Sequence, residues 1–334
     1  MPRRLLIFVV TATACAAAAA PAQAAGWYRF APYVDQVSYP PPSLTAIKAE
    51  SGVRAATLGF VTAKGGKACS PTWGGYREYP ATGRRPYRLG DIRAFRRAGG
   101  GVVVSFGGEG STELATVCHS ARSLAKAYGA VARAYGVRYL DFDIEGAATG
   151  NQAADTRRAK ALAILQRAAR RKHRRLRVAF TLPVGPTGLE DAGKSLLRSA
   201  KRNHVSVDLV NVMAMDYFEA APDPAGRMGA YAIEAGTSTL AEVRSIFGWS
   251  GATAAARLGV TPMIGINDAA DEVFGLQDAS QLAAWAGSQG VGMLAMWELR
   301  RDSACAQPVT TTQINCSGVD QAPWAFSRAL ARAH

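Results

Sequence analysis

The segment Tyr139-Leu140-Asp141-Phe142-Asp143-Ile144-Glu145-Gly146 alternates apolar and acidic residues. Successive side chains of a β-strand point to opposite faces, so the three acids share one face and the apolar residues share the other. Acids on the inner face of a closed sheet are costly unless they share protons or hydrogen bonds. The segment therefore predicts a strand that packs outward against helices and carries Asp141, Asp143 and Glu145 along the inside of a barrel.

Short apolar segments of this kind recur along the chain, each followed by a helical pattern. Together they form eight candidate strands, at 27–33, 56–62, 101–106, 138–144, 177–182, 208–214, 258–266 and 292–297. Eight alternations of strand and helix over about 300 residues are what a (β/α)₈ barrel requires. The chain is thus predicted to be α/β, a single (β/α)₈ TIM barrel. An open doubly wound sheet is the alternative, but no GxGxxG follows the first strand and no linker marks a second domain.

The first 25 residues have the features of a secretory signal peptide. Arg3 and Arg4 precede an apolar run, and Ala22-Gln23-Ala24 has the small-x-small form of a signal-peptidase site. We therefore assign residues 1–25 to a signal peptide and 26–334 to the barrel domain, and we expect a secreted, extracellular protein.

A membrane anchor is not expected. Cys15 raises the alternative of a lipoprotein, but Ala12 stands where a lipobox has a large apolar residue. No later apolar run has the length of about 18 residues that a membrane span needs.

The chain is basic, with a formal net charge of +14 that falls to +12 when Arg3 and Arg4 leave with the signal peptide. Much of this charge lies at 157–177, on a predicted helix whose apolar stripe includes Leu162 and Leu165. We interpret all of its basic residues as the solvated outer face of that helix. No aromatic residues are interleaved for base stacking, so no nucleic-acid partner is predicted.

Four cysteines remain beyond the signal peptide, namely Cys69, Cys118, Cys305 and Cys316. An even number in an exported chain favours two disulfides over free thiols. Of the three possible pairings we favour Cys305–Cys316, which closes a short loop and leaves Cys69–Cys118. The spacing is not that of a zinc site, and we expect neither a metal nor a cofactor.

Closely spaced carboxyl groups cannot all ionise, so one of the acids on 141–145 should stay protonated near neutral pH and serve as a general acid. Glu145 is the candidate, because it stands at the carboxyl end of its strand, where barrels of this kind have their active sites. A divalent-metal site and a solvated acidic loop are the competing interpretations.

Four motifs resemble those of the glycoside hydrolase family 18 chitinases, in the same order and on the same strands. Residues 141–145 resemble the family's DxxDxDxE signature without its first aspartate, and Ser105-Phe106-Gly107-Gly108 resembles SxGG. Met213-Ala214-Met215-Asp216-Tyr217 stands where the family has MxYD, and Trp297 stands where it keeps a tryptophan beneath the substrate. The resemblance extends over essentially all of the mature chain and is nearest to compact bacterial secreted chitinases.

This resemblance implies retaining hydrolysis of β-1,4-linked N-acetylglucosamine in chitin, with the substrate's own acetamido oxygen as the nucleophile. Glu145 would protonate the glycosidic oxygen, and Asp143 would hydrogen-bond the acetamido N–H. Asp141, which lies below the other two acids, would help to determine which of them carries a proton. Asp216 and Tyr217 would position the acetamido group from the opposite wall.

The resemblance also implies a set of substrate-binding residues. These are Trp297, Met213, Met215, Ser105, Gly107, Gly108 and Tyr33. Trp73 and Tyr76, in the loop after the second strand, are candidate aromatic platforms for further sugars, with ordinary loop packing as the alternative.

The segment between the seventh and eighth strands is too short for the α+β insertion domain of some family members. We therefore expect a barrel without that domain, an open groove, and an endo-acting enzyme that functions as a monomer.

Two departures from the family pattern concern Arg138 and Met215. Arg138 replaces the first aspartate, and we expect it either to pair with Asp141 or to belong to the start of the strand. Met215 stands where many members have a tyrosine, whose hydroxyl Tyr217 would supply. The alternative functions are an endo-β-N-acetylglucosaminidase acting on other glycans, and an inactive chitin-binding, lectin-like barrel.

Overall fold

The computed structural model describes residues 27–269 and 271–333, so the predicted signal peptide, residues 1–25, lies outside it. Its centre is a parallel sheet whose strand order follows the chain. The strands are β1 (Tyr33–Asp35), β2 (Ala55–Lys64), β4 (Gly101–Gly107), β5 (Tyr139–Asp143), β6 (Arg177–Gly185), β8 (Leu209–Ala214), β9 (Leu258–Pro262) and β12 (Met293–Leu294). All eight predicted strands are therefore present.

The sheet closes into a barrel through the segment just before β1. The backbone N–H of Ala31 donates to the carbonyl oxygen of Leu294 at 3.2 Å, and that of Tyr33 donates to Met296 at 3.1 Å. Phe30 and Leu294 form a parallel bridge. The strand predicted at 27–33 thus lies beside β12, although its regular pairing with β2 begins only at Tyr33. The predicted (β/α)₈ barrel is confirmed.

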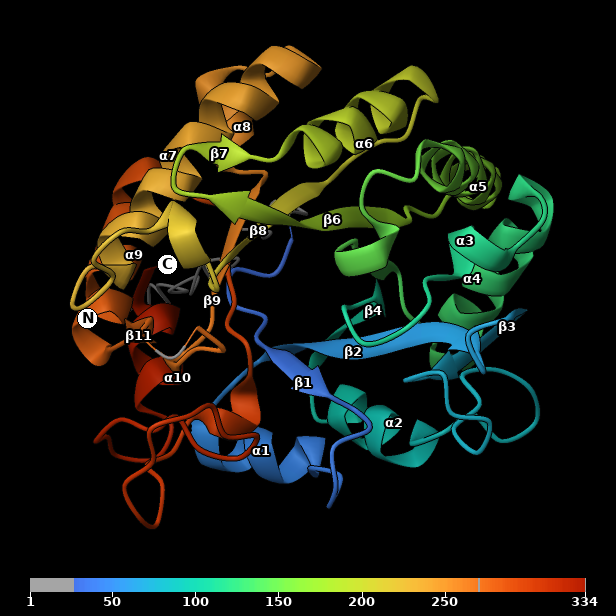
Figure 1. Ribbon diagram of the computed structural model, residues 1–334. Coiled ribbons are helices and arrows are strands. Elements are labelled where there is room, and N and C mark those ends of the chain that lie inside the picture. The colour runs from blue at the N-terminus through green and yellow to red at the C-terminus, as the bar shows by residue number, and fades with distance from the viewer. Residues whose placement is uncertain (1–26, 270, 334) are drawn as a thin grey trace, which may run out of the picture.

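A helix follows each barrel strand and covers the outside of the sheet (Figure 1). These are α1 (Leu44–Ser51), α2 (Leu89–Arg97), α4 (Ala121–Tyr135), α5 (Gln152–Arg170), α6 (Asp191–Arg202), α7 (Met228–Phe247), α9 (Leu276–Gln289) and α10 (Ala325–Leu330). Shorter helices are α3 (Leu114–Val117), α8 (Gly251–Ala255) and the 3₁₀ turns η1 (Gly146–Ala148), η2 (Phe218–Ala220), η3 (Leu299–Arg301) and η4 (Ala331–Ala333). None of the helices that the structure describes combines the length and apolar composition needed to cross a membrane.

Helix α4 shows how the sequence sets these ends. Ser120 and Ser123 form a capping box at its start, in which each side chain accepts a backbone N–H of the other residue. Gly136, with φ of 66°, ends the helix in the left-handed conformation that glycine adopts without steric cost. The chain can therefore turn directly into β5.

Short antiparallel strands decorate the barrel. β3 (Ala68–Trp73) pairs with β2, and β7 (Gly188–Leu189) pairs with β6. Between β9 and α9 a hairpin joins β10 (Gly265–Ile266) to β11 (Val273–Phe274). This small hairpin stands where an insertion domain would lie, so the predicted absence of that domain is confirmed.

Both favoured disulfides are present. Cys69 on β3 bonds to Cys118 at the end of α3, and Cys305 bonds to Cys316 within the C-terminal loop. The first bond joins the β2–β3 hairpin to the segment after β4, although 49 residues separate the two cysteines. It therefore ties together two loops on the same side of the barrel mouth.

The interior of the barrel is layered. Its lower layer is apolar and includes Ala55, Val103, Ala179, Leu209 and Met293. Two residues further along the strands the inward positions are polar: Ser105, Asp141, Thr181, Asn211 and Thr261. Side chains of this second layer hydrogen-bond one another across the strands, so the barrel changes from an apolar base to a polar layer directly beneath its mouth.

Helix α5 corrects the prediction that all of its basic residues face solvent. Arg158 is fully buried, and its guanidinium donates to Glu113 and Asp155, each at 2.8 Å. Because Arg158 precedes Leu162 by four residues and Leu165 by seven, it lies on the apolar face of the helix. The ion pairs hold the start of α3 against α5.

We predict that Arg158→Ala lowers the free energy of unfolding by about 3–5 kcal/mol, because it leaves the buried Glu113 carboxylate without its cation. Arg167→Ala, on the exposed face of the same helix, should change it by less than about 0.5 kcal/mol. Urea unfolding at neutral pH measures both. Similar losses for the two variants would show that the buried pairs do not hold the helix.

Candidate active site

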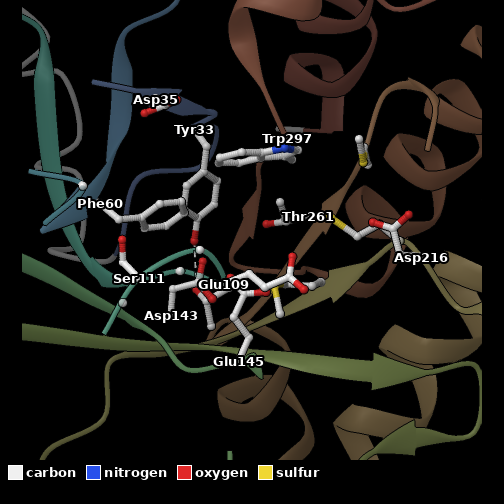
Figure 2. Close-up of a pocket in the computed structure, with 18 of the residues that line it drawn as sticks. Tyr33, Asp35, Phe60, Glu109, Ser111, Asp143, Glu145, Asp216, Thr261 and Trp297 are labelled. Carbon is white, nitrogen blue, oxygen red and sulfur yellow. Dashed lines mark hydrogen bonds between the residues drawn. The ribbon is translucent and has the colours of Figure 1, made fainter. Parts of the chain in front are cut away.

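A cavity of about 390 Å³ opens at the carboxyl ends of the barrel strands, where active sites of this fold lie. Its lining comes from seven barrel strands, β1, β2, β4, β5, β6, β8 and β9, and from the loops that follow the strands (Figure 2). The acidic residues that line it are Asp35, Glu109, Asp143, Glu145, Asp216 and Asp268. Within the described part of the chain, no lysine or arginine lines the cavity. The cavity is therefore acidic although the protein is basic.

Asp141 lies beneath the cavity, in the polar layer of the barrel. Its Oδ2 accepts hydrogen bonds from Ser105 Oγ at 2.6 Å and from the Tyr33 hydroxyl at 3.0 Å, and its Oδ1 accepts one from Thr181 Oγ1 at 2.8 Å. Burial raises the pKa of Asp141 to about 6, while these hydroxyls favour the charged form and limit the rise. Asp141 is therefore a buried carboxyl group with its acceptor sites filled.

Asp143 comes next along β5 and is 3% exposed. Its Oδ1 has no hydrogen-bond partner among the described residues, and the side chain lines the cavity. Burial, followed by the charges of Glu145 and Asp141, raises the pKa of Asp143 well above its ordinary value, and a side-chain hydrogen bond joins it to Glu145. Asp143 is therefore harder to ionise than an ordinary aspartate, and its Oδ1 is available to a ligand.

Glu145 ends the row at the mouth of the barrel. Burial, followed by the negative charge of Glu109, raises the pKa of Glu145 to about 7, and Asp216 adds to the rise. Hydrogen bonds from the Glu109 backbone N–H and from Asp143 oppose it. Glu145 is thus partly protonated near neutral pH and able to donate a proton to a bound molecule.

Two glycines let β4 approach the end of β5. A Cβ on Gly107, whose φ is 110°, would lie 1.9 Å from the backbone oxygen of Asp143. A Cβ on Gly108 would lie 2.7 Å from the Phe60 ring, and the Gly108 N–H donates to that Asp143 oxygen at 3.1 Å. The paired glycines therefore fix the position of Asp143, and both line the cavity as predicted.

The opposite wall comes from the end of β8. Met213, Met215 and Asp216 all line the cavity. Asp216 has a positive φ of 49°, and its Oδ1 accepts the backbone N–H groups of Asp268 at 2.8 Å and Ala269 at 3.2 Å. Burial raises the pKa of Asp216. The segment before β11 thus holds this carboxyl group across the cavity from β5.

A cluster of three aromatic side chains forms another wall of the cavity (Figure 2). Trp297 stacks on Phe60 with ring centroids 5.5 Å apart and an interplanar angle of 21°. Tyr33 lies against both rings at 6.0 Å. The structure therefore places Trp297 and Tyr33 in the cavity, where a flat apolar surface suits the face of a sugar ring.

The two candidate aromatic platforms differ. Tyr76 is 49% exposed and lines the cavity. The prediction for Trp73 is wrong, because its side chain is fully buried and its Nε1 donates to the Tyr135 hydroxyl at 2.8 Å. Ser105, predicted to bind substrate, does not line the cavity either. It is buried beneath the cavity, and its hydroxyl donates to Asp141.

Tyr217 and Arg138 also lie away from the cavity. Tyr217 packs its ring against Tyr231, and its buried hydroxyl has no hydrogen-bond partner among the described residues. It therefore does not replace the hydroxyl missing at Met215. Arg138 is exposed just before β5, so of the two alternatives for this residue the structure supports the second, a place at the start of the strand without a pairing to Asp141. The two-residue period of the strand puts Arg138 on the outer face.

Several residues that line the cavity were not predicted from the sequence, among them Thr181, Glu109 and Phe60. Thr181 shares the inward parity of its predicted strand at 177–182, so that signal was available. Glu109 directly follows the paired glycines, and its position after a strand end was a weaker signal. Phe60 carried no signal, because an apolar residue inside a strand is expected to be core.

Comparison with known proteins agrees with this geometry. Residues 29–231 match the model of the glycosyl hydrolases family 18. The chain is 35% identical over 289 residues to a probable bifunctional chitinase/lysozyme of Escherichia coli K12, covering 84% of this chain and 32% of that protein. It is 33% identical over 292 residues to endochitinase 11 of Metarhizium anisopliae, covering 86% and 55%. The chain thus spans about a third and about half of these relatives.

Among solved structures, the fold is similar to active domain 2 of a thermostable chitinase from Pyrococcus furiosus, solved as catalytic-site mutants complexed with chito-oligosaccharides. The TM-score is 0.80 with 30% identity, covering 92% of this chain and 94% of that one. The segment that matches the family model runs from the first barrel residues past the wall at Asp216 and comprises more than half of the chain. This protein therefore belongs to the glycosyl hydrolases family 18.

Proposed function

We propose that this protein is a secreted chitinase that hydrolyses β-1,4 linkages between N-acetylglucosamine units with retention of configuration. One observation carries the proposal. A partly protonated Glu145 stands beside a buried Asp143 whose Oδ1 has no partner. A proton donor next to an unfilled acceptor suits a substrate that carries a glycosidic oxygen and a neighbouring amide N–H.

In the first step Glu145 gives its proton to the glycosidic oxygen as the bond to the leaving sugar breaks. The acetamido carbonyl oxygen attacks the anomeric carbon and forms an oxazolinium ion. Asp143 Oδ1 accepts the acetamido N–H and so orients that carbonyl. As Glu145 becomes ionised, the proton on Asp143 hydrogen-bonds to it, so the new charge does not lack a partner.

In the second step water attacks the anomeric carbon as the bond between that carbon and the acetamido oxygen breaks, and Glu145 takes a proton from the water, which restores the acetamido group and the starting state. Both displacements occur at the same carbon, so the product keeps the β configuration. Asp141, whose oxygens accept three hydroxyl donors, stays fixed below, and its charge disfavours ionisation of Asp143. Trp297 stacks beneath the sugar ring whose glycosidic bond is cleaved.

Substrate length, export and assembly form the rest of the proposal. The barrel lacks an insertion domain that would deepen the cleft, which supports binding of internal segments and endo-cleavage. Export is supported by the signal-peptide pattern of residues 1–25 and by the two disulfides. We propose a monomer, since the acids and aromatic rings of the site all come from a single chain.

Glu145→Gln should lower kcat on chitohexaose by about 10²–10⁴-fold while leaving oligosaccharide affinity within a few fold, because only the transferable proton is removed. Proton NMR of fresh wild-type products should show the β-anomer first. An initial α-anomer contradicts retention. Binding of chito-oligosaccharides without turnover by the wild type would indicate a lectin-like barrel, and release of glycans only from glycoproteins would indicate an endo-β-N-acetylglucosaminidase.

The pH profile should fall on its alkaline side near pH 7. Glu145 acts in its protonated form, its pKa is raised to about 7, and the proton is lost as pH rises through that value. The quantity to measure is kcat/KM on a chromogenic chito-oligosaccharide from about pH 4 to pH 10. A profile that stays flat to pH 9 would assign the proton donation to another group.

Tyr76→Ala should raise KM for chitohexaose by about tenfold and leave chitotriose less affected, because an aromatic platform for a distant sugar is lost. Tyr39→Ala is the matched control, since Tyr39 is 86% exposed and does not line the cavity. Equal KM values for wild type and Tyr76→Ala would show that the Tyr76 ring packs over its own loop and does not contact the substrate.

A further inference from the structure

Glu109 is an acid at the cavity that the reaction scheme above does not use. It follows the paired glycines after β4, is exposed, and lines the cavity. Its Cγ lies 3.5 Å from the position a Cβ on Gly146 would take, so the side chain lies over the end of β5. Figure 2 shows its carboxyl group beside that of Glu145.

We propose that Glu109 is a positioning residue that keeps the general acid protonated until a substrate binds. Its backbone aims the Glu145 carboxyl group, and its side-chain charge opposes the loss of the proton from that group. This inference rests on the proposed function, in which Glu145 must hold a proton in the resting enzyme.

The two parts of Glu109 act in opposite directions. Its backbone N–H donates to Glu145 and favours the charged form, whereas its carboxylate repels that charge. The repulsion is the second largest cause of the raised Glu145 pKa, after burial and ahead of the hydrogen bond. Removing only the side-chain charge of Glu109 should therefore leave the orientation of the Glu145 carboxyl group unchanged and lower the pKa of that group.

The other charged groups around Glu145 are also acids. Asp143 faces it from β5, with Asp141 below, and Asp216 faces it from the end of β8. Asp141, Asp143 and Asp216 are held by hydrogen bonds and are largely buried. Glu109 is exposed, so dissolved salt screens its charge more strongly than the charges of the three largely buried acids. The Debye length is about 10 Å at 0.1 M salt and about 3 Å at 1 M.

The loop that carries Glu109 is held at both ends. Gly108 before it donates to the Asp143 carbonyl oxygen. After it, the Thr112 carbonyl accepts the Ala63 N–H at 2.9 Å, and Glu113 is fixed by the buried Arg158. The backbone that carries Glu109 therefore keeps a set position relative to the end of β5.

The decisive variant is Glu109→Gln, measured as the pH dependence of kcat/KM at about 20 mM and about 1 M salt. At low salt the alkaline limb should move down by roughly half to one pH unit relative to wild type. Glu109→Asp should retain most of the wild-type profile because it keeps the charge. At high salt the wild-type and Glu109→Gln profiles should nearly coincide.

Glu219→Gln is the matched control, because Glu219 is exposed on η2 near the cavity but does not line it. Its profile should match the wild type. The proposal is overturned if Glu109→Gln leaves the limb unchanged at low salt, or if Glu219→Gln moves it as far. A loss of kcat without a shift of the limb would indicate a merely structural role for Glu109.

A second measurement separates this proposal from the proposed function. The Glu145 carboxyl carbon can be titrated by ¹³C NMR, with its signal assigned by its loss in Glu145→Gln. If the wild type does not cleave chito-oligosaccharides, the proposed function fails, and the NMR titration of Glu109→Gln still decides the role of Glu109. An unchanged Glu145 titration in that variant rejects the proposal even in an active chitinase.

Discussion

The buried carboxyl group of Asp141 is the constraint on which the barrel interior depends. A carboxyl group at this depth is costly unless its oxygens are hydrogen-bonded. Its three donors, Tyr33, Ser105 and Thr181, come from β1, β4 and β6. A slip of any of these strands by one residue would turn its donor to the outer face and leave Asp141 unpaired. The chemistry at the centre and the register of the sheet are therefore specified together.

The three acids on β5 owe their different properties to their partners. Asp141 has hydroxyl donors on both oxygens and a pKa raised only to about 6. Asp143 lacks such donors and its pKa is raised well above its ordinary value, while Glu145 reaches the mouth, where its pKa is raised to about 7. A single strand thus carries three carboxyl groups, two residues apart, whose pKa values are raised to different extents. In the proposed mechanism none of them is a nucleophile, so one strand is sufficient.

Strand alternation made much of this predictable from the sequence. It gave the inward row of acids, because successive side chains of a strand point to opposite faces. The eight strands followed from the recurrence of short apolar segments, each followed by a helical pattern. Predictions failed where a residue's contacts come from a distant segment. Trp73 packs under α4 through Tyr135, and Arg158 meets Glu113 from another element. Nothing in the order of residues along the chain reveals such encounters, whereas the outward direction of Arg138 follows from parity alone.

The absence of cations from the lining of the cavity in the described chain is as much a part of the site as its acids. A guanidinium group beside Glu145 would favour the charged form and lower its pKa, so that the acid would lose its proton at neutral pH. The protein carries a net charge of +14, yet none of the basic residues that the structure describes lines the cavity. The replacement of an acid by Arg138 is compatible with this arrangement because its side chain is exposed outside the barrel. The direction in which each charge points therefore matters more to the chemistry than the total charge.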